Sequence, residues 1–182
     1  MAADRTSQSD PLRIDGVAAA PAPGVIGLTI CPGKKDPHAM SGPWARDLDA
    51  DLEAIRGWGA SALVTLIEDH EFELLKVPDL GQRARALELE WHHLPIRDVS
   101  IPDWRFDAGW QTAGPRLASM LQDGRRVVVH CRGGLGRSGM VAALLLIEQG
   151  VTPGDAIRRV RAARPGAIET REQERHVLAS AG

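Results

Sequence analysis

The chain of 182 residues has the length of one globular domain and is long enough to bury a core without disulfides. With 43% hydrophobic and 25% charged residues, global disorder is excluded, and two cysteines, Cys31 and Cys131, exclude a disulfide scaffold. A net charge of −2 argues against nucleic-acid binding, and no apolar run approaches the roughly 18 residues of a membrane helix. Because the polar N-terminus lacks a secretory signal pattern, we expect a cytoplasmic protein without a membrane partner.

Taken in chain order, residues 1–12 are expected to form a disordered tail ahead of a single domain, 13–182. Short apolar runs predict strands at 25–30, 62–67, 91–96 and 126–131. Helical periodicity and start or stop signals predict helices at 45–58, 71–76, 78–90, 106–121, 140–149, 152–163 and 169–179. This alternation predicts an α/β fold with one central, mostly parallel sheet that is flanked by helices on both faces.

Charge is divided unevenly along the chain. Residues 1–96 contain 9 basic and 15 acidic groups, whereas residues 97–182 contain 13 basic and 9 acidic groups. The basic second half favours an anionic ligand there.

A glycine-rich loop carries the strongest chemical signal of that half. Between the predicted strand 126–131 and the apolar helix that follows, the sequence reads His130-Cys131-Arg132-Gly133-Gly134-Leu135-Gly136-Arg137-Ser138. A loop that joins a strand to a helix points successive backbone N–H groups toward an anion, and glycines let the backbone curl around it. We therefore expect residues 132–137 to form a phosphate-binding loop.

The cysteine in this loop indicates catalysis rather than binding alone. A thiol at a helix N-terminus, close to a guanidinium, is expected to ionise readily and act as a nucleophile. The planar fork of Arg137 can hold two phosphoryl oxygens, and Ser138 can donate a hydrogen bond to the sulfur as it leaves. The loop also matches the dinucleotide fingerprint GxGxxG, but no acidic residue ends a strand about 20 positions later, as that fold requires.

The pattern HCxxGxxRS resembles the signature loop of the protein tyrosine phosphatase superfamily. Five segments together resemble its cyclin-dependent-kinase-associated (KAP-like) dual-specificity branch over roughly residues 28–180: CPGKKD, GASALVTLIEDHEFELLKVPDL, WHHLPIRDVSIPD, HCRGGLGRSG and RPGAIET. The resemblance implies a metal-free and cofactor-free phosphatase in which Cys131 is the nucleophile and Arg137 the phosphate clamp. It also implies a phosphoprotein substrate, and the expected oligomeric state is a monomer.

Two upstream aspartates are candidates for the general acid that protonates the leaving oxygen. The resemblance favours Asp98, in PIRD, whereas Asp103, beside Trp104, can alternatively cap the following helix. It further implies that His130 arranges the surroundings of the cysteine and that Gln173 positions the hydrolytic water, although Gln173 can also be an ordinary helix residue.

Two alternative functions and the role of Cys31 remain open. A catalytically silent module would bind phosphoproteins without turnover, but binding alone needs no nucleophile. A phosphoinositide phosphatase is less favoured, because Leu135 occupies a place where lipid phosphatases carry lysine and Arg132 is the loop's extra cation. Cys31 could protect Cys131 as a disulfide partner or be an ordinary loop thiol.

Overall fold

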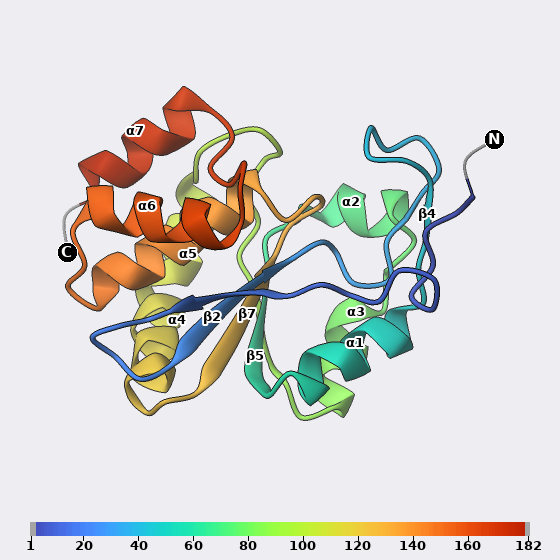
Figure 1. Cartoon of the computed structure of the whole chain (residues 1–182), viewed down its shortest axis with the longest axis horizontal. Coiled ribbons are helices and arrows are strands. Elements are labelled where there is room, and N and C mark those ends of the chain that lie inside the picture. Colours follow the sequence, from blue (N-terminus) through green and yellow to red (C-terminus); the bar gives the residue numbers. More distant parts are fainter. Residues whose placement is uncertain (1–2, 181–182) are drawn as a thin grey trace.

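The computed structural model describes residues 3–180 and is built around one mixed sheet (Figure 1). Its strand order is β1-β2-β7-β5-β6; β1 pairs antiparallel with β2, and the other neighbours are parallel. The strands are β1 (Asp15–Ala18), β2 (Val25–Thr29), β5 (Ala60–Thr65), β6 (Glu90–His93) and β7 (Arg126–His130). A separate two-stranded ribbon consists of β3 (Lys35–Asp36) and β4 (Trp44–Ala45).

Helices cover both faces of this sheet. Figure 1 shows α1 to α3 on one side and α4 to α7 on the other. Within residues 3–180 they are α1 (Leu48–Gly57), α2 (Asp69–Leu74), α3 (Leu80–Ala86), α4 (Trp104–Gln122), α5 (Gly136–Glu148), α6 (Pro153–Ala163) and α7 (Arg171–Ala179). The predicted fold class is confirmed. None of these helices is long and apolar enough to cross a membrane.

The central strand β7 shows why the core anchors the glycine-rich loop. Val127 and Val129 pack into the core cluster under α4 to α7, whereas Val128 packs into the cluster under α1 to α3, because successive side chains point to opposite faces. All three are fully buried, and burying each contributes roughly 1.5–3 kcal/mol. The apolar helix α5 is buried over nearly its whole length. Both ends of the loop between β7 and α5 are therefore fixed by well-packed elements.

The N-terminal segment packs against the domain, in contrast to the disordered tail that its composition suggests. Arg5 forms a bridge with Trp44 of β4. The Ser7 hydroxyl donates to Asp51 at 2.8 Å and accepts from the Asp47 backbone N–H at 2.9 Å. These partners lie about forty residues away in sequence, so local polarity gives no sign of them. Arg5 and Ser7 thereby hold this segment against β4 and α1.

Candidate active site

Cys131 follows the carboxyl end of β7, at the start of the glycine-rich loop. Its sulfur accepts a hydrogen bond from the Gly134 backbone N–H at 3.2 Å and lies 3.4 Å from the Ser138 hydroxyl oxygen. Gly134 has φ +70°, and a Cβ there would lie 2.5 Å from the Thr29 carbonyl oxygen. Only glycine fits this turn, which brings the loop backbone around the sulfur.

Arg137 lies in the first turn of α5 and is almost completely buried. Its guanidinium donates to both carboxylate oxygens of Glu71 on α2, at 2.7 and 2.9 Å, and to the Ile96 carbonyl at 3.0 Å. Burial alone would lower the pKa of Arg137, but the hydrogen bonds that it donates to Glu71, together with nearby negative charge, outweigh burial and raise that pKa. Arg137 is therefore a fixed, permanently charged group.

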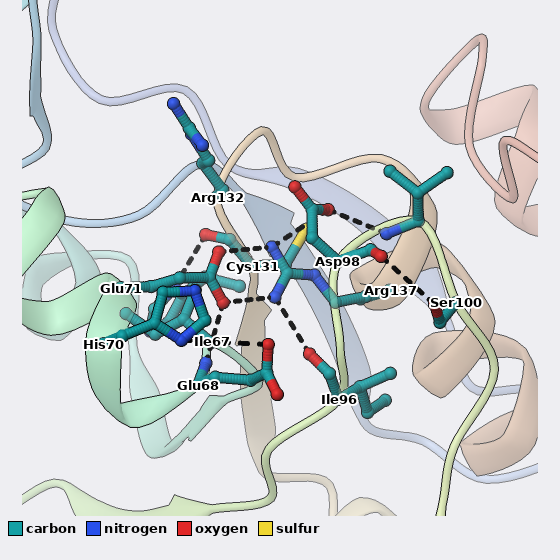
Figure 2. Close-up of polar contacts among 12 residues, drawn as sticks. Ile67, Glu68, His70, Glu71, Ile96, Asp98, Ser100, Cys131, Arg132 and Arg137 are labelled. Carbon is teal, nitrogen blue, oxygen red and sulfur yellow. Dashed lines mark hydrogen bonds and ion pairs between the residues drawn. The ribbon is translucent and has the colours of Figure 1, made fainter.

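Asp98 lies on the loop between β6 and α4 and reaches the same guanidinium. One of its carboxylate oxygens is 3.2 Å from Arg137 Nη2, and Figure 2 shows Glu71, Arg137 and Asp98 together in front of Cys131. The same carboxylate accepts from the Val99 backbone N–H at 2.9 Å. Asp98 is half-exposed, so it is open to solvent and to a substrate that enters the site.

Asp103, the other candidate acid, has a different set of partners. Its side chain caps α4 by accepting from the Arg105 backbone N–H at 2.9 Å. It also pairs with the Arg105 guanidinium at 3.0 Å, and these hydrogen bonds lower the pKa of Asp103. The structure thus places Asp98, and not Asp103, against Arg137.

His130 is buried behind the loop. One ring nitrogen lies 2.8 Å from the Thr65 hydroxyl and the other 3.0 Å from the Cys131 carbonyl oxygen. Trp91 donates to the same hydroxyl at 2.8 Å. Burial lowers the pKa of His130 to about 4, so the ring is neutral near pH 7. A neutral ring with both nitrogens in contact orients the backbone at Cys131.

The other predicted loop residues have partners on the outer side of the loop. Arg132 pairs with Asp36 of β3 at 2.8 Å. The Gly133 and Gly134 carbonyls accept from the Arg164 guanidinium, at 3.3 and 2.5 Å. The Leu135 carbonyl accepts from the Ile168 N–H at 3.1 Å. These contacts hold the loop's shape from outside.

One amide of the predicted cradle is already engaged. The Gly136 backbone N–H donates to a carboxylate oxygen of Glu169 at 2.9 Å. Glu169 was not among the residues predicted for the site, and neither was Glu71. Both carboxylates lie in segments distant from the loop in sequence, and no local pattern distinguishes them from surface acids.

Gln173 connects α7 to the loop that carries Asp98. Its amide nitrogen donates to the Ser100 carbonyl at 3.1 Å, while its oxygen accepts from the backbone N–H groups of Glu169 and Thr170. The side chain is fully buried. Gln173 is thus an anchor for the Asp98 loop, with both ends of its amide occupied.

Cys31, for which the sequence left open a disulfide partner or an ordinary loop thiol, is fully buried and, like Cys131, a free thiol. Its sulfur donates to the Pro32 carbonyl at 3.6 Å, and burial raises the pKa of this thiol. It is therefore held in the protonated form, which is unreactive.

The fold and the arrangement around Cys131 are consistent with a phosphatase, and comparison with known proteins assigns the family. A family model described as "PTP-SAK: Swiss Army Knife protein, DSP-PTPase phosphatase domain" matches residues 37–177. The chain belongs to this family of dual-specificity and tyrosine phosphatases, and it is a phosphatase of that type.

Within the family the chain is similar to KAP-like proteins. It is 31% identical over 150 residues to mouse cyclin-dependent kinase inhibitor 3, covering 81% of this chain and 67% of that protein. Human protein tyrosine phosphatase type IVA 3 is 32% identical over 123 residues, covering 62% of this chain and 68% of that protein. The crystal structure of kinase associated phosphatase (KAP) with its catalytic-site cysteine replaced by serine aligns with a TM-score of 0.79 and 27% identity, covering 94% of this chain and 98% of that one.

Proposed function

We propose that this phosphatase hydrolyses phosphate monoesters on proteins through a cysteinyl-phosphate intermediate. The observation that carries the proposal is the 3.2 Å approach of Asp98 to Arg137, which lies in the first turn of α5, where the loop that starts at Cys131 ends. A nucleophile, a phosphate clamp and an acid thereby share one site.

In the first step, the Cys131 sulfur attacks phosphorus as the ester oxygen leaves. The Arg137 guanidinium and the loop amides hold the three equatorial oxygens, and the Asp98 carboxyl gives its proton to the leaving oxygen. In the second step, water attacks the same phosphorus and Asp98 takes a proton from that water. The S–P bond breaks, inorganic phosphate leaves, and the sulfur, stabilised by the Gly134 N–H and the Ser138 hydroxyl, returns to its starting state.

Phosphotyrosine is the proposed substrate, with phosphoserine and phosphothreonine also admitted. Relatives of this chain carry the names cyclin-dependent kinase inhibitor 3 and protein tyrosine phosphatase type IVA 3, which supports a phosphoprotein substrate. Arg132, the cation that could bind a phosphoinositide headgroup, is paired with Asp36, which favours protein over lipid. We further propose that the enzyme acts as a cytoplasmic monomer.

The test is hydrolysis of p-nitrophenyl phosphate in excess EDTA by the wild type, Cys131→Ser and Cys31→Ala. We expect metal-independent turnover in the wild type and in Cys31→Ala, and none in Cys131→Ser. Because a serine hydroxyl keeps the loop's shape, the inactive variant should still bind inorganic phosphate. Undiminished activity of Cys131→Ser would disprove the cysteine mechanism, whereas phosphate binding by an inactive wild type would indicate a binding module.

A further inference from the structure

A cavity of about 310 Å³ lies beside the phosphate loop, with Gly133 in its wall. The N-terminal segment, the chain around β3 and β4, and Arg164 enclose the rest of it. We call it the Trp44 cavity, because the Trp44 indole lines it. Its lining carries one acidic side chain, Asp10, against five basic ones: Arg5, Arg13, Lys34, Arg46 and Arg164.

Three of these cations converge on a single indole. The Arg5 guanidinium carbon lies 5.0 Å from the Trp44 ring centroid, Lys34 Nζ lies 5.5 Å away, and the Arg46 guanidinium carbon lies 5.7 Å away. Each contact with the ring face is favourable, but the three like charges repel one another across a short distance. A bound anion would relieve that repulsion.

Nearby carboxylates neutralise only part of this charge. Arg46 pairs with Asp51 at 2.8 Å, and Arg13 and Arg164 share Asp15 at 2.8 and 2.7 Å. Arg5 approaches Asp10 only to 3.8 Å. Three carboxylates therefore face five cations, which leaves an excess of two positive charges around the cavity.

Lys34 is a buried cation with unused donors. It is 4% exposed, and its ammonium donates one side-chain hydrogen bond, to the Arg132 carbonyl at 3.3 Å. Among residues 3–180, no carboxylate pairs with it within 4.0 Å. An ammonium has three N–H donors, so two remain for a ligand in the cavity. Burial lowers the pKa of Lys34, and an incoming anion would favour its charged form.

We propose that the Trp44 cavity is a second anion site, in which Lys34 and Arg5 bind a phosphate-sized dianion. Gly133 belongs both to the catalytic loop and to this cavity, so the two anions would lie on either side of the same loop. The dianion is either a second phosphate of the substrate or a free anion. Its part in substrate selection rests on the proposed phosphatase function, whereas anion binding does not.

The first arm of the test measures binding, independently of turnover. The catalytic loop is saturated with one equivalent of orthovanadate, and inorganic phosphate is titrated by calorimetry into the wild type, Lys34→Met, Arg5→Gln and Lys35→Met. Lys35 is the matched control, because it neighbours Lys34 but lines a different cavity. We expect one saturable phosphate site of equal affinity in the wild type and in Lys35→Met. The phosphate affinity of that site should be at least tenfold lower in Lys34→Met and several-fold lower in Arg5→Gln.

Absence of that site in the wild type, or equal affinity in all variants, would overturn the proposal. Arg5→Gln keeps the test decisive if Lys34→Met does not fold, because the Arg5 side chain is 47% exposed.

The second arm distinguishes the two sources of the anion. The ratio of kcat/KM for a bisphosphorylated peptide to that for its monophosphorylated form is compared between the wild type and Arg5→Gln. A ratio that falls several-fold in Arg5→Gln identifies a second substrate phosphate as the ligand. An unchanged ratio together with calorimetric binding identifies a free anion. An enzyme without turnover would refute the proposed function but leave the binding arm intact.

Discussion

The Arg137 guanidinium and the Glu71 carboxylate form a two-point ion pair, at 2.7 and 2.9 Å, with both side chains almost completely buried. Glu71 comes from α2 and Arg137 from α5, so the pair joins elements on opposite sides of the sheet. It fixes the plane of the guanidinium before any phosphate binds, and such fixed charge need not reorganise during the reaction.

Replacement of Glu71 by glutamine should therefore impair both folding and catalysis. Removing one partner of a buried pair leaves an uncompensated charge and costs up to roughly 3–5 kcal/mol. A misplaced clamp should also lower kcat/KM by about 10²-fold. Urea unfolding and steady-state kinetics measure the two effects, with the exposed Glu73→Gln on the same helix as control. If Glu71→Gln retains full kcat/KM, Glu71 does not orient the clamp.

The two candidate acids can be separated by matched amide substitutions. Asp98→Asn should lower the rate on phenyl phosphate, a poor leaving group, by about 10²-fold or more, because the leaving oxygen then lacks its proton donor. The loss on p-nitrophenyl phosphate should be smaller, since that leaving group needs less protonation. Asp103→Asn should leave both rates unchanged, because asparagine caps a helix as well as aspartate does. A larger leaving-group effect in Asp103→Asn would transfer the acid role to Asp103.

Local sequence pattern was sufficient to predict strands β2, β5, β6 and β7 of the sheet and the glycine-rich loop that follows β7. The run of valines in β7 and the glycines that follow it are adjacent in the sequence, so they can be recognised without knowledge of distant contacts. Boundaries were less accurate: α5 begins at Gly136, four residues before the expected start, because the loop's glycines hide the helix. Helix α4 spans Trp104–Gln122 and continues through Pro115. Proline lacks the backbone N–H of a helical hydrogen bond, but tertiary packing of the helix outweighs that loss.

Contacts between distant segments could not be predicted in the same way. Glu71 is an acid among acids in EDHEFE, and only folding shows that it faces Arg137. The N-terminal segment is polar in sequence, yet its Ser7 and Arg5 find partners on α1 and β4. Strand β1 was missed because only one of its four residues is buried.

The anchor between Gln173 and Ser100 predicts how Gln173 acts. If Gln173 holds the Asp98 loop, Gln173→Ala should lower the rate more on phenyl phosphate than on p-nitrophenyl phosphate, as a partial version of Asp98→Asn. If it instead positions water, the phospho-enzyme should accumulate and produce a burst of p-nitrophenol. Rapid-mixing kinetics distinguish the two, with the exposed neighbour Glu172→Ala as control. A burst without a leaving-group effect would contradict the anchor role.

The buried His130 predicts a pH dependence of stability. Its pKa falls from 6.5 to about 4 on folding, so between these values the unfolded chain binds a proton that the folded chain does not. His130 should therefore cost no stability above about pH 6.5. As the pH falls from 6.5 toward 4, the free energy of unfolding should decline by up to roughly 3 kcal/mol. Urea unfolding across this range should show the slope in the wild type and in the exposed-site control His70→Gln. His130→Asn, which keeps a polar side chain but does not titrate, should flatten it; an undiminished slope in His130→Asn would assign the proton uptake to another group.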